Sequence, residues 1–381
     1  MTQLSSHARE TIDPTDVAPM PIADLRREES PEADIAHRLI EASFAAGWTD
    51  GLPTVPCTPR LLAQFLERTA RDPEEVVFRM AHLNRQCTVR EAAVCAVMAG
   101  CLPEYFPVVL AALDSLEALG VGPSALWQST TGTAPLLLVN GPVRHALEIN
   151  SEGNIFGSGF RANATIGRAI RLITLNVFML RPHLLDQATQ ASPAKYTCCI
   201  AENEAASPWP AFHEEFGFDS GDSTVTTMLI RGTLYMESRQ TSKPEELLND
   251  FVDSIVRTGR ILGDGGTTCL VLSPEHARVF GDAGWSKPDV RSYLFERATR
   301  TIAELNHVGK GAISSRTRWR VPQDHPDAIL PEDPTKPLRV LKNVEAIDLV
   351  VAGADNAGVS TIVENFGPSA RPLPIIKVEG A

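Results

Sequence analysis

Ala134-Pro-Leu-Leu-Leu-Val-Asn-Gly-Pro142 is a continuous apolar run that ends in a turn signal. Residues 134–139 are typical of a buried strand, and Asn140-Gly141-Pro142 ends it. The chain before this run has a mostly helical pattern, whereas after it strands alternate with helices. Such alternation predicts an α/β fold of mixed α+β layers, with a helical N-terminal third.

The pattern of apolar residues and breakers predicts the elements on both sides of that strand. Helices are expected at 31–47, 60–71, 89–99, 108–116, 164–177, 244–258, 274–281 and 287–305. Further strands are expected at 196–201, 224–231, 268–272 and 347–352. We expect residues 1–30 to be disordered, because they are polar and rich in proline. Residues 31–120 should form a mainly helical region that packs with an α/β region, residues 121–381, as one unit.

Composition excludes several classes of protein. The 381 residues carry 35 Lys plus Arg against 47 Asp plus Glu, a net charge of -12 that disfavours nucleic acid as a partner. No apolar stretch reaches the ~18 to 20 residues that span a bilayer, which predicts no membrane partner. The first 30 residues lack the basic start and apolar core of a signal peptide, so we expect a cytoplasmic protein.

The seven cysteines are scattered and include no Cys-x-x-Cys pair, which argues against a disulfide framework or a zinc knuckle. Cys198 and Cys199 are adjacent in an expected strand and should point to opposite faces. Only Cys57, in a proline-rich loop, has an exposed setting. We predict that no cysteine of this chain is the sole catalytic nucleophile.

Two carboxylates mark the end of the strand expected at 196–201. Glu202 and Glu204 are two residues apart, so in an extended backbone they face the same side, and His213 follows after a short loop. This set could carry proton transfer or hold a divalent metal. The alternative is a solvated loop whose acids cap the next helix. Lys195 and Trp209, at the two ends of the stretch 195–209, are candidate ligand-binding residues.

Two loops carry further candidate residues. The glycine-rich loop 153–163 leads into a helix, and Arg161 and Arg168 could clamp a carboxylate or phosphate, with Asn163 orienting the anion. Plain loop-to-helix geometry explains the same glycines equally well. Asp50, in Trp48-Thr-Asp-Gly51, is a candidate catalytic carboxylate, and its alternative is an ordinary Asp-Gly turn.

Several longer phrases together are similar to one known family. They are Trp48-Thr-Asp-Gly-Leu-Pro53, Val97-Met-Ala-Gly-Cys-Leu-Pro-Glu-Tyr-Phe-Pro-Val-Val-Leu-Ala-Ala112, Val139-Asn-Gly-Pro142, Arg161-Ala-Asn-Ala-Thr-Ile-Gly-Arg-Ala169, Cys199-Ile-Ala-Glu-Asn-Glu204 and Gly284-Trp-Ser-Lys287. In this order they resemble the large protein associated with the UGSC family of bacterial selenoproteins or cysteine homologues, over roughly residues 45–380.

The resemblance implies a metabolic setting and a homo- or hetero-oligomer. The family is named for a (seleno)Cys-Gly-Ser-Cys motif on a small companion protein or fused region, and this chain has no such motif. A reactive thiol or selenol would therefore come from a small partner protein. Position 57 departs from the family, in which a second proline is expected in place of Cys57.

Three functions remain open at the level of sequence. The first is a metabolic enzyme or enzyme subunit acting on a small polar or anionic metabolite, with a lyase or redox step that uses a thiol or selenol partner. The second is a non-catalytic scaffold that binds and activates a small Cys-Gly-Ser-Cys protein. The third is a metal-dependent hydrolase that uses Glu202, Glu204 and His213.

Overall fold

The computed structural model describes residues 31–120, 127–257, 265–366 and 373–380. The segment expected to be disordered, residues 1–30, lies outside the described residues. In the described part no helix combines the length and the apolar character needed to cross a membrane.

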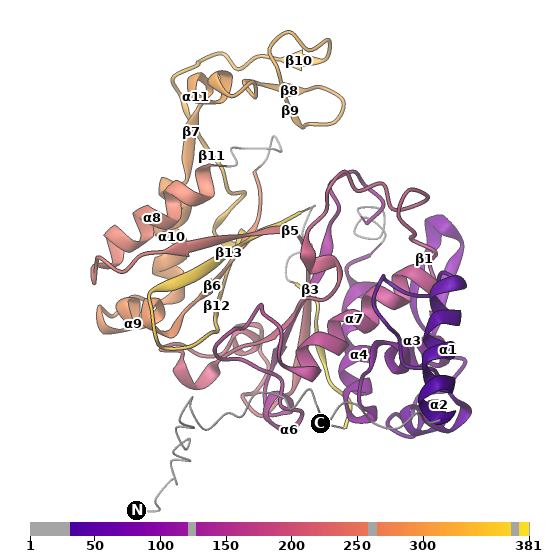
Figure 1. Ribbon diagram of the computed structural model, residues 1–381. Coiled ribbons are helices and arrows are strands. Elements are labelled where there is room, and N and C mark those ends of the chain that lie inside the picture. The colour runs from indigo at the N-terminus through magenta and orange to yellow at the C-terminus, as the bar shows by residue number, and fades with distance from the viewer. Residues whose placement is uncertain (1–30, 121–126, 258–264, 367–372, 381) are drawn as a thin grey trace, which may run out of the picture.

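One mixed seven-stranded sheet forms the centre of the molecule (Figure 1). Its strands follow the order β12-β6-β13-β5-β3-β4, and β14 pairs with β5 off this path. They are β3 (Ala134–Asn140), β4 (Cys199–Ala201), β5 (Thr224–Glu237), β6 (Thr268–Leu272), β12 (Ile347–Val351), β13 (Val359–Asn365) and β14 (Ile375–Lys377). The expected mixed α/β fold class is thus confirmed.

The two halves of this sheet repeat one arrangement. β3 and β4 are parallel and β5 is antiparallel to β3, while β6 and β12 are parallel and β13 is antiparallel to β6. β5 and β13 join the halves at the centre. A parallel pair requires a crossover. In the first half the crossover contains α6 (Val143–Ala146) and α7 (Arg161–Asn176), and in the second α9 (Pro274–Asp282) and α10 (Lys287–Arg297).

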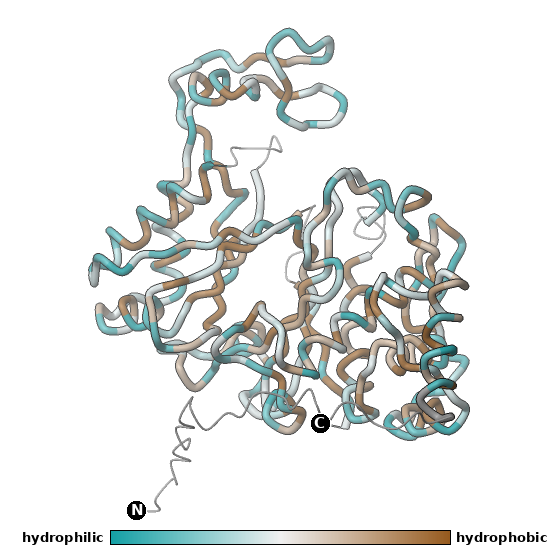
Figure 2. The backbone as a smooth tube through the Cα atoms, in the orientation of Figure 1, coloured by the Kyte–Doolittle hydropathy of each residue, from teal (hydrophilic) through white to brown (hydrophobic). Residues whose placement is uncertain are grey.

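Helices cover each half of the sheet separately (Figure 1). The first half packs against α4 (Phe106–Ala118) and α7. On these two helices packs α3 (Val89–Ala99), followed outward by α2 (Pro59–Leu66), with α1 (Pro31–Ala45) also on the outside. The second half packs against α8 (Pro244–Val256), α9 and α10. A third cluster of buried residues on the opposite face of the sheet joins the halves, for example Leu138 and Met228 with Val271 and Val350. Figure 2 shows the apolar residues concentrated along these strands and the inner helices.

The α3 helix illustrates how local sequence fixes an element. Thr88 and Glu91 form a capping box at its start, and Gly100, with a φ of 91°, ends it in the left-handed region. Ala92 and Ala96 are fully buried and small, which lets α3 pack closely on α7. The predicted bounds, 89–99, agree with the structure.

The structure corrects two of the expected elements. Residues 31–120 also contain a hairpin, β1 (Val76–Met80) with β2 (Arg85–Thr88). The single helix expected at 287–305 is wrong, because α10 stops at Arg297 and β7 (Thr299–Thr301) pairs with β11 (Pro337–Arg339) before α11 (Ile302–His307) begins. The chain between β7 and β11 protrudes at the top of Figure 1.

That protrusion also holds a small antiparallel sheet. Its strands are β8 (Ala312–Ser314), β9 (Arg320–Val321) and β10 (Ala328–Ile329). Short 3₁₀ helices occur elsewhere in the chain: η2 (Ala81–Leu83), η3 (Pro103–Tyr105), η4 (Pro193–Lys195), η5 (Glu204–Ala206), η6 (Phe212–Phe216) and η7 (Val344–Ala346).

Candidate functional site

A cavity with a volume of about 470 Å³ lies between α7 and the segment 182–196. A much smaller pocket of about 20 Å³ adjoins it, and Trp127 and Pro135 lie in the wall of this pocket. The two share three charged residues in their walls: Arg171, Asp186 and Lys195. We refer to both together as the Lys195 cavity.

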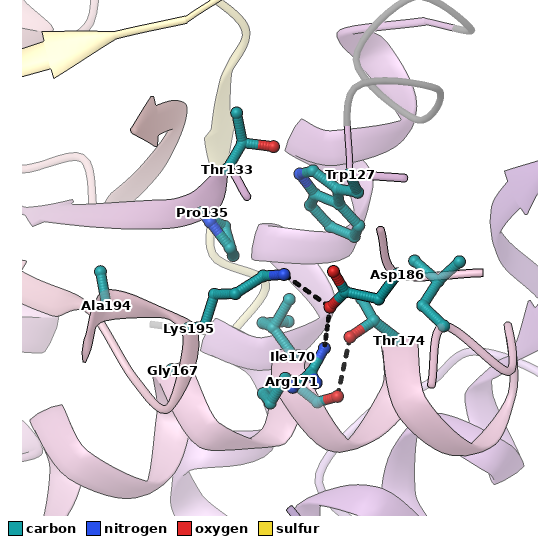
Figure 3. Close-up of a pocket in the computed structure, with 11 residues that line it drawn as sticks. Trp127, Thr133, Pro135, Gly167, Ile170, Arg171, Thr174, Asp186, Ala194 and Lys195 are labelled. Atoms are coloured by element: carbon teal, nitrogen blue, oxygen red, sulfur yellow. Dashed lines mark hydrogen bonds and ion pairs between the residues drawn. The ribbon is translucent and has the colours of Figure 1, made fainter. Parts of the chain in front are cut away.

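Two cations meet one carboxylate in this wall (Figure 3). Lys195 Nζ donates a hydrogen bond of 2.5 Å to Asp186 Oδ2, and Arg171 Nη1 lies 3.8 Å from the same oxygen. Asp186 Oδ1 accepts from the Ala188 N–H at 3.2 Å. Arg171 lies outside hydrogen-bond distance of Asp186, and it lines both parts of the cavity. Two cations against one carboxylate give this wall a net positive charge.

Burial disfavours the charged forms of Lys195 and Arg171. It lowers the pKa of Lys195, an effect that the hydrogen bond and charge of Asp186 oppose and that the charge of Arg171 reinforces. Burial likewise lowers the pKa of Arg171, opposed by Asp186, Asp50 and Tyr196. An anionic ligand would offset this cost, since a second negative charge stabilises both cations. The electrostatics of the cavity therefore favour a small anion.

The backbone holds this cluster in an unusual conformation. His183 and Ala191, which line the cavity, have φ values of 67° and 64°, in the left-handed region that non-glycine residues seldom adopt. Met179, just before them, has a φ of 55°. Such residues cost on the order of 1 kcal/mol or more each and are concentrated at functional sites. The strain therefore marks segment 179–191 as a candidate functional region.

Asp50 lines the Lys195 cavity, but its carboxylate is already bound. Arg168 Nε and Nη2 donate to its two oxygens at 2.9 and 2.8 Å, and the Asp50 side chain is 2% exposed. Arg168 also donates to the Leu52 and Pro53 carbonyls, at 3.1 and 2.9 Å. These hydrogen bonds hold the loop of residues 48–53 against α7, where it forms one wall of the cavity. The structure thus brings together three predicted residues, Asp50, Arg168 and Lys195.

Glu202 and Glu204 converge, as expected, but in a separate buried network. Asn140 Nδ2, at the end of β3, donates to Glu202 Oε2 at 2.5 Å and to Glu204 Oε1 at 3.1 Å. Glu204 also accepts from the Gly141 N–H at 2.7 Å and pairs with Arg144. Burial raises the pKa of Glu202, opposed by the charge of Lys287 and by hydrogen bonds from the Phe212 N–H and Asn140.

Four other predicted residues serve as links between elements. Asn163 bonds the backbone of Asn150 and Cys199, and Arg161 Nε donates to the Gly100 carbonyl at 3.0 Å. Trp209 Nε1 donates to the Trp285 carbonyl at 2.8 Å. His213 is fully buried, and its Nε2 lies 3.1 Å from the Asp219 carbonyl oxygen.

The expected metal site is not found. Among the described residues no group of three or more His, Cys, Asp or Glu side chains is arranged to hold a metal ion. The reason is visible at Glu204, whose two oxygens are taken by Asn140, Gly141 and Arg144. The structure also turns the His213 ring to a backbone carbonyl, not to these carboxylates.

All seven thiols are free, and six are buried. Burial raises the pKa of Cys57, the one partly exposed thiol, so it too favours the unreactive protonated form. Cys198 and Cys199 belong to the cores on opposite faces of the sheet, which confirms the expected opposite orientation.

Sequence reasoning missed Arg171 and Asp186. Arg171 follows Arg168 by three residues within an expected helix, and that spacing places the two side chains on one face. The sequence thus contains a signal that would have added Arg171 to the candidate residues. Asp186 lies in an irregular segment, where only tertiary structure brings it to Lys195. None of the protein-family models, curated proteins or solved structures compared with the chain matches it.

Proposed function

We propose that this protein is a cytoplasmic metabolic enzyme, or a subunit of one, that binds a small anionic metabolite in the Lys195 cavity and acts on it there. The observation that carries the proposal is the pair of cations, Arg171 and Lys195, placed against the single carboxylate of Asp186. With Arg168 and Asp50 included, three cations face two carboxylates. The remaining positive charge is what an anion would neutralise.

Calorimetric titration with oxalate, succinate and inorganic phosphate tests this proposal. At least one of them should bind the wild-type protein, and Arg171→Gln should weaken that binding about tenfold or more, since a charged hydrogen bond contributes about 1.5–3 kcal/mol. Arg90→Gln is the matched control, because Arg90 is half exposed and paired with Glu74 away from the cavity. If none of the three anions binds, or Arg171→Gln binds as tightly as wild type, the cavity is not an anion site.

The reaction class stays a prediction. A lyase or redox step with a thiol or selenol partner is what the resemblance to the UGSC-associated proteins implies. A thiol supplied by a partner is supported by the seven cysteines of this chain, because their thiols are buried or favour the protonated form. Co-purification with a small Cys-Gly-Ser-Cys protein would test the partner directly.

The scaffold alternative has one observation in its favour. An open groove of about 830 Å³, lined mostly by apolar residues, runs between α1 and α3 and includes Trp48, Val55 and Cys57. Leu39 lies in this groove and is 46% exposed, so Leu39→Asp should leave the fold intact. Loss of binding to a Cys-Gly-Ser-Cys protein in Leu39→Asp, with oxalate binding preserved, would favour a scaffold role.

A further inference from the structure

We propose that Lys195 is the nucleophile for a small 2-oxo acid, forming a covalent imine with its carbonyl carbon while Arg171 binds its carboxylate. This inference rests on the proposed function, because the anion must first bind in the Lys195 cavity. It adds the substrate class and the role of the amine.

The positions of the two cations carry the inference. The Lys195 amine and the Arg171 guanidinium approach the same oxygen of Asp186, at 2.5 and 3.8 Å (Figure 3). In a 2-oxo acid the carbonyl carbon is bonded directly to the carboxylate carbon. A carboxylate held by Arg171 therefore brings the carbonyl carbon next to the Lys195 amine.

The surroundings also suit an amine nucleophile. A lysine attacks only as the neutral amine, and burial lowers the pKa of Lys195 towards that form. Asp186 Oδ2, at 2.5 Å, is placed to accept the proton that Lys195 loses. Trp127, Pro135 and Ile170 line the inner end of the cavity with apolar surface. That surface disfavours the charged ammonium and limits water around the imine.

The step balances without a further reactant. Lys195 transfers a proton to Asp186, the neutral nitrogen forms a bond to the carbonyl carbon, and a second proton of that nitrogen passes to the carbonyl oxygen. Asp186 then returns its proton to the resulting hydroxyl group, the carbon–oxygen bond breaks, and water leaves. The product is a protonated imine, which can accept an electron pair when a neighbouring carbon–carbon bond is cleaved.

Lys287 provides an internal comparison. Its amine also lies 2.5 Å from a carboxylate, Glu215, but it donates a second hydrogen bond to the Pro210 carbonyl and its side chain is only 4% exposed. Lys195 is 15% exposed and opens onto the cavity. We therefore expect reaction at Lys195 and none at Lys287.

Reductive trapping tests the inference. The full chain is incubated with glyoxylate, the smallest 2-oxo acid, and sodium cyanoborohydride, then analysed by intact mass and peptide mapping. One adduct is expected, at Lys195, and oxalate, an anion without a ketone or aldehyde carbonyl, should suppress it. Lys195→Arg, which keeps the charge opposite Asp186, should lose the adduct, and Asp186→Asn should slow its formation about tenfold or more, as for loss of a general base.

The outcomes separate the two proposals. If oxalate binds the wild-type protein but glyoxylate leaves no adduct on Lys195, the covalent role is overturned and the anion site stands. Equal labelling of Lys195 and the exposed Lys243 also overturns it, since reaction would then be non-specific. Failure of all three anions to bind, in the titration described above, rejects the anion site itself.

Discussion

Gly167 sets the distance between helix α7 and the segment that carries Lys195. A Cβ atom at this position would lie 2.4 Å from Thr197 Oγ1 and 2.8 Å from the Cys198 backbone nitrogen. Both distances are below van der Waals contact, and the second involves backbone that cannot rotate away. Glycine is therefore required for Lys195 to sit opposite Arg171 across the narrow part of the cavity.

We expect Gly167→Ala to destabilise the protein by about 1–3 kcal/mol, as overpacking does in well-packed regions. Urea unfolding measures this change. Gly221→Ala is the control, because no atom of the described part of the chain lies within 4 Å of the Cβ that it would add. Equal unfolding midpoints for Gly167→Ala and Gly221→Ala would show that the helix and the segment can move apart freely.

Glu202 should make stability depend on pH. Its carboxyl is fully buried, Oε1 has no hydrogen-bond partner among the residues that the structure describes, and burial raises its pKa above the ordinary value of 4.5. A raised pKa means that the folded state binds the proton more tightly than the unfolded state. The resulting stabilisation is complete below pH 4.5 and is lost as the pH rises through the folded pKa.

Comparison with Glu202→Gln isolates this effect, because glutamine cannot titrate. The free energy of unfolding of the wild type, relative to that of Glu202→Gln, should fall as the pH rises from 4.5, by at most about 1.4 kcal/mol per pH unit. Urea unfolding at several values between pH 4.5 and 8 measures it. A difference that is flat, or that grows with pH, contradicts this account.

At the scale of elements, the Trp48–Pro53 loop depends on helix α7. Arg168 donates from Nε and Nη2 to the Asp50 carboxylate. Its Nη2 also donates to the Leu52 and Pro53 carbonyls of the same loop. Planar, two-point contact with a nearly buried carboxylate is a geometry that lysine cannot reproduce. Asp50 therefore acts by holding a wall of the cavity in place.

A double-mutant cycle with Asp50→Asn and Arg168→Gln should give a coupling energy above about 1.5 kcal/mol. The control is the Arg90–Glu74 pair, whose side chains are 47% and 69% exposed and whose coupling should stay below about 1 kcal/mol. Denaturant unfolding of the four proteins in each cycle provides the energies. Similar coupling in both pairs would mean that the loop is not held by this contact.

Elements with strong local signals were predictable from sequence. β6 was expected at 268–272 and is found there, because a short run of buried residues has no competing pattern. β5 extends to Glu237, beyond the expected 231, because its second half pairs with β13. That pairing joins residues more than 100 apart in sequence, so no local pattern encodes it.

The same distinction applies to the candidate site. Glu202 and Glu204 meet at Asn140, but Glu204 begins the 3₁₀ helix η5, so the extended backbone expected for the pair is not what brings them together. The meeting of Lys195 with Asp186 and Arg171 depends on an irregular segment with two left-handed residues in the cavity wall. Such a conformation is imposed by tertiary contacts, among them the close packing at Gly132 against Ala188 and Ala191.

At the scale of the whole molecule, the sheet is curled so that its two edge strands meet. The Asn203 N–H, just after β4, donates to the Val351 carbonyl of β12 at 2.7 Å. The halves are thus joined three times: by the β5–β13 pairing, by this contact, and by the buried cluster that includes Met228 and Val350. We expect such a structure to unfold as one unit.

Tryptophans in both halves of the molecule allow this to be measured. Trp127 is buried in the core of the first half, whereas Trp285 packs beside the core of the second. Two variants are needed, each of which retains one of these tryptophans and has the other tryptophans changed to Phe. When Met228→Ala is added to each variant, the midpoint of urea unfolding should shift by the same amount in both. That change should cost about 2–5 kcal/mol, because Met228 is 1% exposed. A midpoint that moves for one tryptophan and not the other would mean that the halves unfold independently, since coincident transitions are the test of a single cooperative unit.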